Sequence, residues 1–344
     1  MTDRHEQVTS FQDVETGLRA IVAIHDSTLG PGFGGTRFHP YAGAAAALAD
    51  VLRLSRGMTL KTAMADLPCG GAKAVIIGDP RTLRSEPLLE SYGRFVQSLG
   101  GRYVTAGDVG VSAEDLDVIG RTTEFVVGRT VAAGGYGDSG PMTALGVLHA
   151  IRAAAATRWG SADLTGCAVG VEGLGKVGFE LARLLLAAGA KVTAAEISTP
   201  ARELPGVVLT DRVLDAPVDV YAPCALGATL TADSVPRIRA SIVCGAANNQ
   251  LATADVERLL ADRDVIWVPD FVASAGGVTM GSYEFRRLPV EDVPARVARI
   301  FDTTAEVLAL SRDRGLLPGA AAESIARARI NRRRTAEPDQ DRWM

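Results

Sequence analysis

The apolar residues of this chain fall into two kinds of run, separated by glycine-rich sequence. Short runs rich in β-branched residues are typical of strands, whereas longer runs rich in alanine and leucine are typical of helices. In the first third of the chain, the predicted strands are 18–29, 70–78 and 102–106, and the predicted helices are 44–56 and 88–98. The glycine cluster at 30–37 predicts a loop. Together these elements indicate an α/β domain.

A change of composition at 132–140, AAGGYGDSG, indicates a flexible linker. Beyond it a helix is predicted at 143–157, and strands then alternate with helices to about Gly277. That alternation predicts a parallel, doubly wound sheet. The sequence from 290 to 334 is mostly helical and becomes arginine-rich. Because no aromatic residues interleave, the run at 332–334 is interpreted as a solvated helix end rather than a nucleic-acid patch.

Length and composition narrow the class of protein. The 344 residues suggest two domains, and 47% hydrophobic residues are typical of a globular protein. A formal charge of −4 gives no general attraction to nucleic acid or to anionic membranes. The longest apolar stretches, such as 184–190, are too short to span a bilayer, and residues 1–13 do not have the pattern of a signal peptide. Four scattered cysteines indicate reduced thiols and no metal site, so we expect a cytoplasmic protein.

Lysine is scarce in this chain. Of 36 basic residues only four are lysine, and two of them, Lys61 and Lys73, stand 12 positions apart in largely apolar, glycine-rich sequence. Arginine does not lose its proton in proteins, whereas a desolvated lysine can. Both lysines are predicted to follow turns, and Asp108 is predicted at the carboxyl end of a strand. Two lysines and an aspartate suit acid–base chemistry on an anionic substrate, with one ammonium holding a carboxylate and the other lysine accepting a proton.

The opposing interpretation is that each lysine extends to solvent, the usual fate of an isolated lysine. A retained pair in a chain that otherwise uses arginine argues against that reading without removing it.

A nucleotide-binding pattern lies in the second half of the chain. A short apolar strand at 167–172 runs into the glycine loop 173–178, a helix is predicted at 179–188, and a second strand at 190–196 ends in an acid. The order of all four parts is that of a dinucleotide-binding fold, and an unrelated glycine turn is the weaker alternative.

Each residue of this pattern has a physical role. Gly173 permits the tight turn, Gly175 lets backbone N–H groups approach a pyrophosphate at the helix N-terminus, and Gly178 allows close helix–strand packing. Glu196 can accept hydrogen bonds from the ribose and would repel a 2′-phosphate, which favours NAD over NADP. Lys176 and Arg202 lie close enough in sequence to weigh against that preference. The residues predicted to line the cofactor in this loop are Gly173, Leu174, Gly175, Lys176, Val177 and Gly178.

Seven stretches of the chain, in order and over nearly its whole length, resemble the leucine/valine/phenylalanine dehydrogenases. They are 29–37 (LGPGFGGTR), 57–63 (GMTLKTA), 70–80 (GGAKAVIIGDP), 102–110 (RYVTAGDVG), 221–227 (YAPCALG), 245–250 (GAANNQ) and 269–278 (PDFVASAGGV).

The resemblance implies reversible oxidative deamination of an L-amino acid to a 2-oxo acid and ammonia, with NAD as cofactor. Lys61 matches the lysine that holds the substrate carboxylate, and Lys73 matches the lysine that activates water. Asp108 matches the acid that exchanges protons with the substrate amine. The other matched positions line the substrate (Gly34 and Gly35) or surround the nicotinamide and its ribose (Thr143 and Asn248).

The resemblance also implies an architecture. An N-terminal α/β substrate-binding and oligomerisation domain, 1–135 with a C-terminal helical segment at about 318–344, is joined to a Rossmann-like NAD-binding domain at 136–317. The cleft between them is expected to close on a hinge near 134–140. The partners implied are the small-molecule substrate and further copies of the chain, as dimer or octamer, with no nucleic acid and no membrane.

Substrate choice rests on four positions. Ala106 and Val278 are typical of relatives that bind branched aliphatic side chains. Phe33 is larger than the usual residue and Gly281 is smaller, so compensating changes can move the pocket without closing it. Valine or leucine is favoured, and an aromatic or biosynthetic amino acid is the alternative.

Ser274 stands where the family pattern has asparagine before Ala-Gly-Gly. The shorter hydroxyl loses one amide hydrogen bond, which a water could replace, or the substrate range could shift. A catalytically silent relative that binds NAD or an amino acid as a sensor is the third reading, and it is motivated by Ser274 alone.

Overall fold

The computed structural model describes residues 4–196 and 204–335 of the chain. Within it the chain forms two compact units. The first consists of Met1–Asp138, Gly281–Leu288 and Ser324–Met344, and the second of Ser139–Met280 and Pro289–Glu323.

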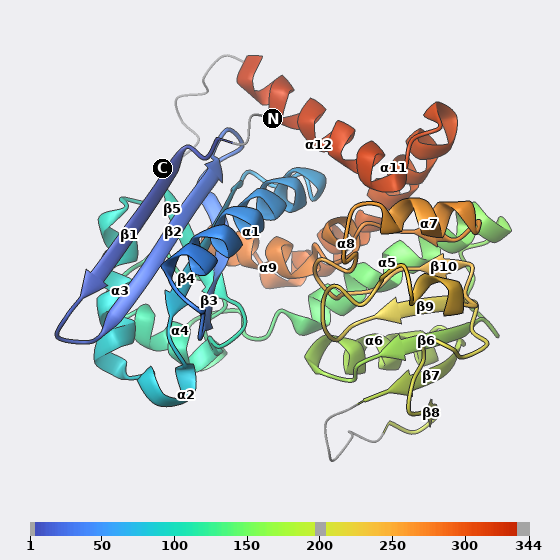
Figure 1. Cartoon of the computed structure of the whole chain (residues 1–344), viewed down its shortest axis with the longest axis horizontal. Coiled ribbons are helices and arrows are strands. Elements are labelled where there is room, and N and C mark those ends of the chain that lie inside the picture. The colour runs from blue at the N-terminus through green and yellow to red at the C-terminus, as the bar shows by residue number, and fades with distance from the viewer. Residues whose placement is uncertain (1–3, 197–203, 336–344) are drawn as a thin grey trace. The chain divides into compact units, whose positions relative to one another are not determined.

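The first unit is built on a five-stranded mixed sheet of order β1-β2-β4-β3-β5 (Figure 1). Its antiparallel pairs are β1 with β2 and β2 with β4, whereas β3 runs parallel to both β4 and β5. The strands are β1 (Gln7–Asp13), β2 (Leu18–Asp26), β3 (Gly32–His39), β4 (Gly70–Ile77) and β5 (Tyr103–Gly107).

Helices cover both faces of this sheet, because alternate residues of a strand point to opposite sides. Ala72, Ala74 and Ile76 of β4 pack into the core beneath α3 and α4, while Val75 and Ile77 pack against α1. The helices are α1 (Ala44–Met64), α2 (Pro80–Leu83), α3 (Glu86–Ser98) and α4 (Ala113–Ile119), followed by the 3₁₀ turn η1 (Val131–Ala133).

The loop predicted at 30–37 is wrong, because most of it forms β3. Its glycines serve close strand packing rather than a turn: a Cβ on Gly34 would lie 1.8 Å from the carbonyl oxygen of Ala72 on β4. The predicted helix 44–56 also continues further, to Met64 in α1. Lys61 therefore lies in the last turn of a helix, and Lys73 lies inside β4 rather than directly after a turn.

The second unit contains a six-stranded, fully parallel sheet of order β11-β10-β9-β6-β7-β8 (Figure 1). Counted along the chain from β6, this is the 3-2-1-4-5-6 order of dinucleotide-binding Rossmann folds. The predicted parallel, doubly wound sheet is thereby confirmed. The strands are β6 (Ala168–Glu172), β7 (Lys191–Ala195), β8 (Val207–Leu209), β9 (Val220–Pro223), β10 (Ile242–Val243) and β11 (Ile266–Trp267).

The helices of the second unit flank this sheet, and two helices, α9 and α12, contribute residues to both units. Their bounds are α5 (Gly140–Trp159), α6 (Lys176–Ala187), η2 (Val235–Arg237), α7 (Val256–Asp262), α8 (Asp270–Ala273), α9 (Gly276–Phe285), η3 (Val290–Asp292), α10 (Val293–Ala298), α11 (Ile300–Arg314) and α12 (Pro318–Thr335).

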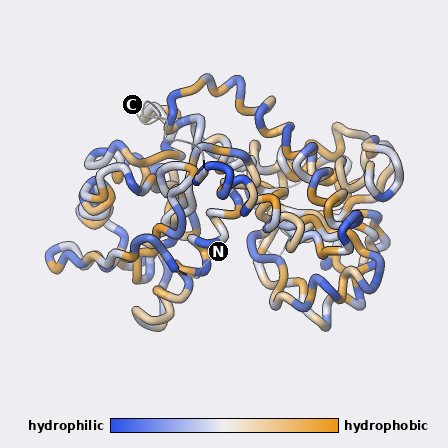
Figure 2. The backbone as a smooth tube through the Cα atoms, turned by 90° about the horizontal axis from the view of Figure 1, so that it is seen from above, coloured by the Kyte–Doolittle hydropathy of each residue, from blue (hydrophilic) through white to orange (hydrophobic). Residues whose placement is uncertain are grey.

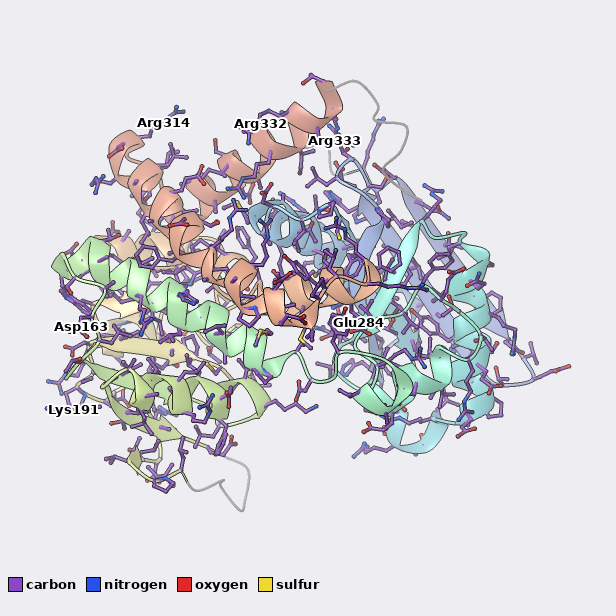
Figure 3. All side chains as sticks on the ribbon, turned by 180° about the vertical axis from the view of Figure 1, so that it is seen from behind. Asp163, Lys191, Glu284, Arg314, Arg332 and Arg333 are labelled. Carbon is purple, nitrogen blue, oxygen red and sulfur yellow. The ribbon has the colours of Figure 1, made fainter. Side chains whose placement is uncertain are left out.

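The segment 281–288, which the sequence placed in the second domain, belongs to the first unit. Glu284 on α9 (Figure 3) accepts hydrogen bonds from the backbone N–H of Gly128, at 3.0 Å to each carboxylate oxygen. The backbone N–H groups of Arg129 and Tyr136 also donate hydrogen bonds to this carboxylate. The start of the predicted linker 132–140 is thus tied to α9, and its role as a hinge stays a prediction.

Hydrophobic and hydrophilic positions alternate along α12, the helix that leads to the C-terminus (Figure 2). Its arginines fasten it to the first unit. Arg329 donates to the carbonyl oxygens of Ala63 and Met64 at the end of α1, and Arg334 pairs with Asp26 at 2.6 Å.

Candidate functional site

Lys73 and Asp108 form an ion pair in the first unit, with 2.8 Å between Nζ and Oδ2. Lys73 comes from the middle of β4 and is 8% exposed, while Asp108 directly follows β5. Arg37 of β3 adds a second cation, with its Nε 3.1 Å from the same Oδ2 atom. The two predicted catalytic residues, Lys73 and Asp108, are therefore in direct contact, and Arg37 contacts the same carboxylate.

Strand alternation explains why these groups converge. Lys73 has the same parity as Val75 and Ile77, which pack against α1, so the ion pair lies on the sheet face that α1 covers. The segment after β5 stays beside β3, because the Phe38 N–H donates to the carbonyl of Val109 at 2.9 Å.

The electrostatics of Asp108 reflect two opposing effects. Burial raises the pKa of this carboxyl group, but the charges of Lys73 and Arg37 outweigh burial and hold the pKa below its usual value. Asp108 is therefore a carboxylate at neutral pH, placed between two cations.

Glycines of β3 make room for this pair. A Cβ on Gly35 would lie 3.1 Å from the Cβ of Asp108 and 2.5 Å from the carbonyl oxygen of Gly107. Gly35 is paired in register with Ala106, and Gly34 with Thr105. Of the predicted substrate-lining residues, Gly35 and Ala106 are thus brought beside Asp108, whereas Gly34 lies against the backbone of Ala72 on β4.

Lys61 lies half-buried in the last turn of α1. This helix packs against β4, the strand that carries Lys73, so the two lysines come from neighbouring elements of the first unit.

Phe33 and Gly281 are in contact distance within the first unit. A Cβ on Gly281 would lie 3.3 Å from the Phe33 ring and 3.3 Å from Val127. The Phe33 ring is buried and packs edge-on against Phe285, with 5.9 Å between ring centroids. Val278 lies about two turns before Phe285 on α9, on the part of that helix assigned to the second unit.

The glycine loop of the second unit joins β6 to α6 in a tight turn. Gly173 has a φ of 96°, and a Cβ on Gly178 would lie 1.9 Å from the Gly173 carbonyl oxygen. Gly175 is the N-cap of α6, and a Cβ there would meet no atom within 4 Å. The N-terminus of α6 is thus open to a phosphate group, and the residues present fit a dinucleotide.

Glu196, directly after β7, accepts a hydrogen bond from the Leu174 N–H at 2.7 Å. The acid predicted to bind ribose therefore also ties the end of β7 to the glycine loop. Arg202, the cation weighed against NAD, lies outside the described residues.

Thr143 and Asn248 lie in the second unit, on α5 and in the loop after β10. The Thr143 hydroxyl donates to Ser139 within the first turn of α5, and a Cβ on Gly277 would come within 2.7 Å of that hydroxyl oxygen. Asn248 is exposed, and its carbonyl oxygen would lie 2.4 Å from a Cβ on Gly227.

Ser274, the departure from the family pattern, is buried at the end of α8. Its hydroxyl donates to the Asp270 carbonyl at 2.6 Å, one turn earlier. The side chain thus caps its own helix.

Sequence reasoning missed the groups behind Arg37. Its Nη1 lies 2.9 Å from Oδ2 of Asp50 on α1, and the Tyr41 hydroxyl donates to the same oxygen at 2.7 Å. Because the sequence predicted a loop at 30–37, strand period gave no signal there; in the structure Arg37 lies on the same face of β3 as Gly35.

Two further features concern ligands and membranes. A cavity of about 870 Å³ in the first unit is lined by residues of the segments 120–136 and 284–287 and by Gln97 of α3, and none of the predicted site residues line it. Among residues 4–196 and 204–335, no group of three or more His, Cys, Asp and Glu side chains could hold a metal ion, and no helix is long and apolar enough to cross a membrane.

The chain matches two family models. Residues 5–125 match the one described as Glu/Leu/Phe/Val dehydrogenase, dimerisation domain, and residues 198–288 match Glutamate/Leucine/Phenylalanine/Valine dehydrogenase. A valine dehydrogenase of Streptomyces virginiae is 48% identical over 336 residues, which cover 95% of this chain and 94% of the relative.

The chain belongs to the Glu/Leu/Phe/Val dehydrogenase family. A leucine dehydrogenase of Bacillus cereus is 41% identical over 95% of this chain and 91% of its own length. The solved structure of L-tryptophan dehydrogenase from Nostoc punctiforme superposes with a TM-score of 0.83, at 38% identity over 96% of this chain and 97% of that one. As a member of this family the chain is an amino acid dehydrogenase, which confirms the resemblance, the two-part α/β fold and the enzyme class expected from sequence.

Proposed function

We propose that this chain catalyses NAD-dependent oxidative deamination of branched aliphatic L-amino acids, with valine and leucine preferred. The observation that carries the chemistry is the Lys73–Asp108 ion pair, which is 2.8 Å long and joins a buried lysine to a carboxylate that is about one-fifth exposed. The aliphatic preference is supported by the 48% identity to a valine dehydrogenase, compared with 38% to the tryptophan dehydrogenase.

In this proposal the first unit binds the amino acid and mediates self-association, and the second unit binds NAD. Lys61 holds the substrate carboxylate as a point charge. Gly173 and Gly175 would hold the pyrophosphate at the N-terminus of α6, and Gly178 would keep that helix close to the glycine loop. Glu196 would bind the ribose, and Thr143 and Asn248 would border the nicotinamide. When bound, NAD would supply the hydride acceptor for oxidation at the substrate Cα.

The protein's own residues handle the protons. Asp108, held as a carboxylate, accepts a proton from the substrate ammonium, so that the amine lone pair can form the imine. Lys73, once deprotonated, takes a proton from the water that attacks the imine carbon. Asp108 returns its proton to the nitrogen of the resulting carbinolamine, and the hydroxyl proton then passes to the Asp108 carboxylate as the C=O bond of the 2-oxo acid forms and ammonia leaves.

A second candidate, an aromatic substrate, is motivated by the absence of a side chain at Gly281. The Phe33 ring and Val127 already lie 3.3 Å from where a Cβ on Gly281 would be, which is why the aliphatic substrate is placed first.

The test is NADH formation at alkaline pH with L-valine, L-leucine, L-isoleucine, L-phenylalanine and L-tryptophan. We expect kcat/KM for valine or leucine to exceed that for either aromatic acid by about tenfold or more. Turnover of the aromatic acids alone would move the enzyme to the second candidate. No turnover of any of them, with NADH still bound, would contradict the proposed chemistry.

A further inference from the structure

Arg37 bridges two carboxylates on the α1 side of the first sheet. Its Nε contacts Asp108 Oδ2 at 3.1 Å, and its Nη1 contacts Asp50 Oδ2 at 2.9 Å. The guanidinium is about one-fifth exposed, as are both carboxylates. Only arginine presents two donors in a rigid, planar fork that fits this geometry.

The far side of Arg37 is itself fixed. Asp50 receives the Tyr41 hydroxyl at 2.7 Å on Oδ2 and Arg53 at 2.7 Å on Oδ1. Asp50 projects from α1, Tyr41 from the segment between β3 and α1, and Arg37 from β3. Three parts of the chain thus determine where the guanidinium points.

Asp108 Oδ2 is therefore shared by two cations of different chemistry. A lysine such as Lys73 can lose a proton, whereas the guanidinium of Arg37 stays charged. If Lys73 were the only counter-ion, its deprotonation would leave a mostly buried carboxylate unpaired, which is unfavourable.

We propose that Arg37 is a positioning residue that orients Asp108 and remains its counter-ion when Lys73 gives up its proton. The inference rests on the proposed function, in which Lys73 and Asp108 both exchange protons. It assigns a role to a residue that contacts neither substrate nor cofactor in that proposal. Asp50 does not contact Asp108 in this proposal; it orients the Arg37 guanidinium through their ion pair.

The charges around Asp108 support this role. Lys73 from β4 and Arg37 from β3 face the carboxylate directly, and Asp50, Arg53 and Tyr41 stand behind Arg37. Removing the Arg37 charge favours the protonated forms of the Lys73–Asp108 pair.

The experiment compares Arg37→Met with Arg37→Lys, which keeps the charge but not the fork. The acid limb of kcat/KM against pH, measured with L-valine, is expected to move about one pH unit or more upward in Arg37→Met. In Arg37→Lys the limb stays near the wild-type position while kcat falls. The matched control is Arg81→Met, which removes an exposed arginine paired with Asp79 and is expected to change neither quantity.

A second readout does not require turnover. The rate at which acetic anhydride labels Lys73 is followed against pH by mass spectrometry, with thermal unfolding showing that each variant is folded. The labelling curve is expected to move to higher pH in Arg37→Met and not in Arg81→Met. An unmoved curve in a folded Arg37→Met would overturn the inference about Arg37. Absence of amino acid turnover in the wild-type enzyme would instead count against the proposed function.

Discussion

Phe33 and Gly281 occupy one space between them: a Cβ on Gly281 would lie 3.3 Å from the Phe33 ring. A contact that short is tighter than ordinary packing, so a larger residue at 281 requires a smaller one at 33. The large ring at position 33 therefore depends on the absence of a side chain at position 281.

This pairing predicts non-additive effects of substitution. Gly281→Val is expected to destabilise the protein by about 1–3 kcal/mol, because the core is overpacked against a buried ring. Phe33→Leu in the same chain should recover most of that loss. Denaturant unfolding of both single variants and the double variant measures the coupling, and purely additive free energies of unfolding would contradict the shared space.

The same pair bears on substrate choice. Phe33→Leu alone enlarges the space near Gly281, so kcat/KM is expected to shift toward phenylalanine relative to valine by about tenfold or more. An unchanged ratio of kcat/KM values would show that Phe33 does not line the substrate pocket.

Glu196 is expected to act on cofactor choice through its charge and on the glycine loop through its hydrogen bond to Leu174. Glu196→Gln keeps an acceptor for that N–H but removes the charge, so discrimination against NADP should fall by about tenfold, equivalent to about 1.4 kcal/mol. Glu196→Ser removes both and should also weaken binding of NADH.

Fluorescence titration with NADH and NADPH separates the two effects. Equal discrimination in Glu196→Gln and wild type would rule out a role for the charge. Equal NADH affinity in the two variants would show that the bond to Leu174 does not matter.

His25 predicts a loss of stability in acid. Burial of the ring, aided by the nearby His5, lowers its pKa to about 4, and its Nδ1 is hydrogen-bonded to the Thr59 hydroxyl at 2.8 Å. The unfolded chain, with an ordinary pKa near 6.5, binds a proton that the folded chain does not. Stability is therefore complete above about pH 6.5 and declines as pH falls toward 4, by about 3 kcal/mol at most.

Denaturant unfolding between pH 7 and pH 4 measures this slope. His25→Asn, which keeps a polar group near Nδ1 but does not titrate, should flatten it. A slope unchanged by that substitution would assign the acid sensitivity to other groups.

Much of the fold was predictable because its apolar runs are long and periodic. The strand β4, the helix α3 and the strand–loop–helix at 167–188 follow directly from such runs. The region 30–37 could not be predicted in this way, because its glycines are explained by backbone contacts with β4 and β5 that exist only after folding. Likewise, Gly57 suggested an end for α1, yet the helix continues past it to Met64.

The sequence identified individual residues of the site, but it did not show which of them contact one another. Lysine scarcity drew attention to Lys73, and the end of a strand drew attention to Asp108. Their 2.8 Å contact and the presence of Arg37 depend on the pairing of β4 with β3 and of β3 with β5. A single sequence does not reveal the register between strands that are distant along the chain, so these contacts could not be predicted.

The most direct test of the central claim is Lys73→Ala, assayed for L-valine-dependent NADH formation and, by fluorescence titration, for NADH binding. Lys191→Ala, an exposed lysine at the start of β7 (Figure 3), is the control. The account predicts that turnover falls by about 10²–10⁴-fold in Lys73→Ala while NADH affinity stays at the wild-type value, because the two functions reside in separate units. Retained turnover, or turnover lost together with NADH binding, would contradict it.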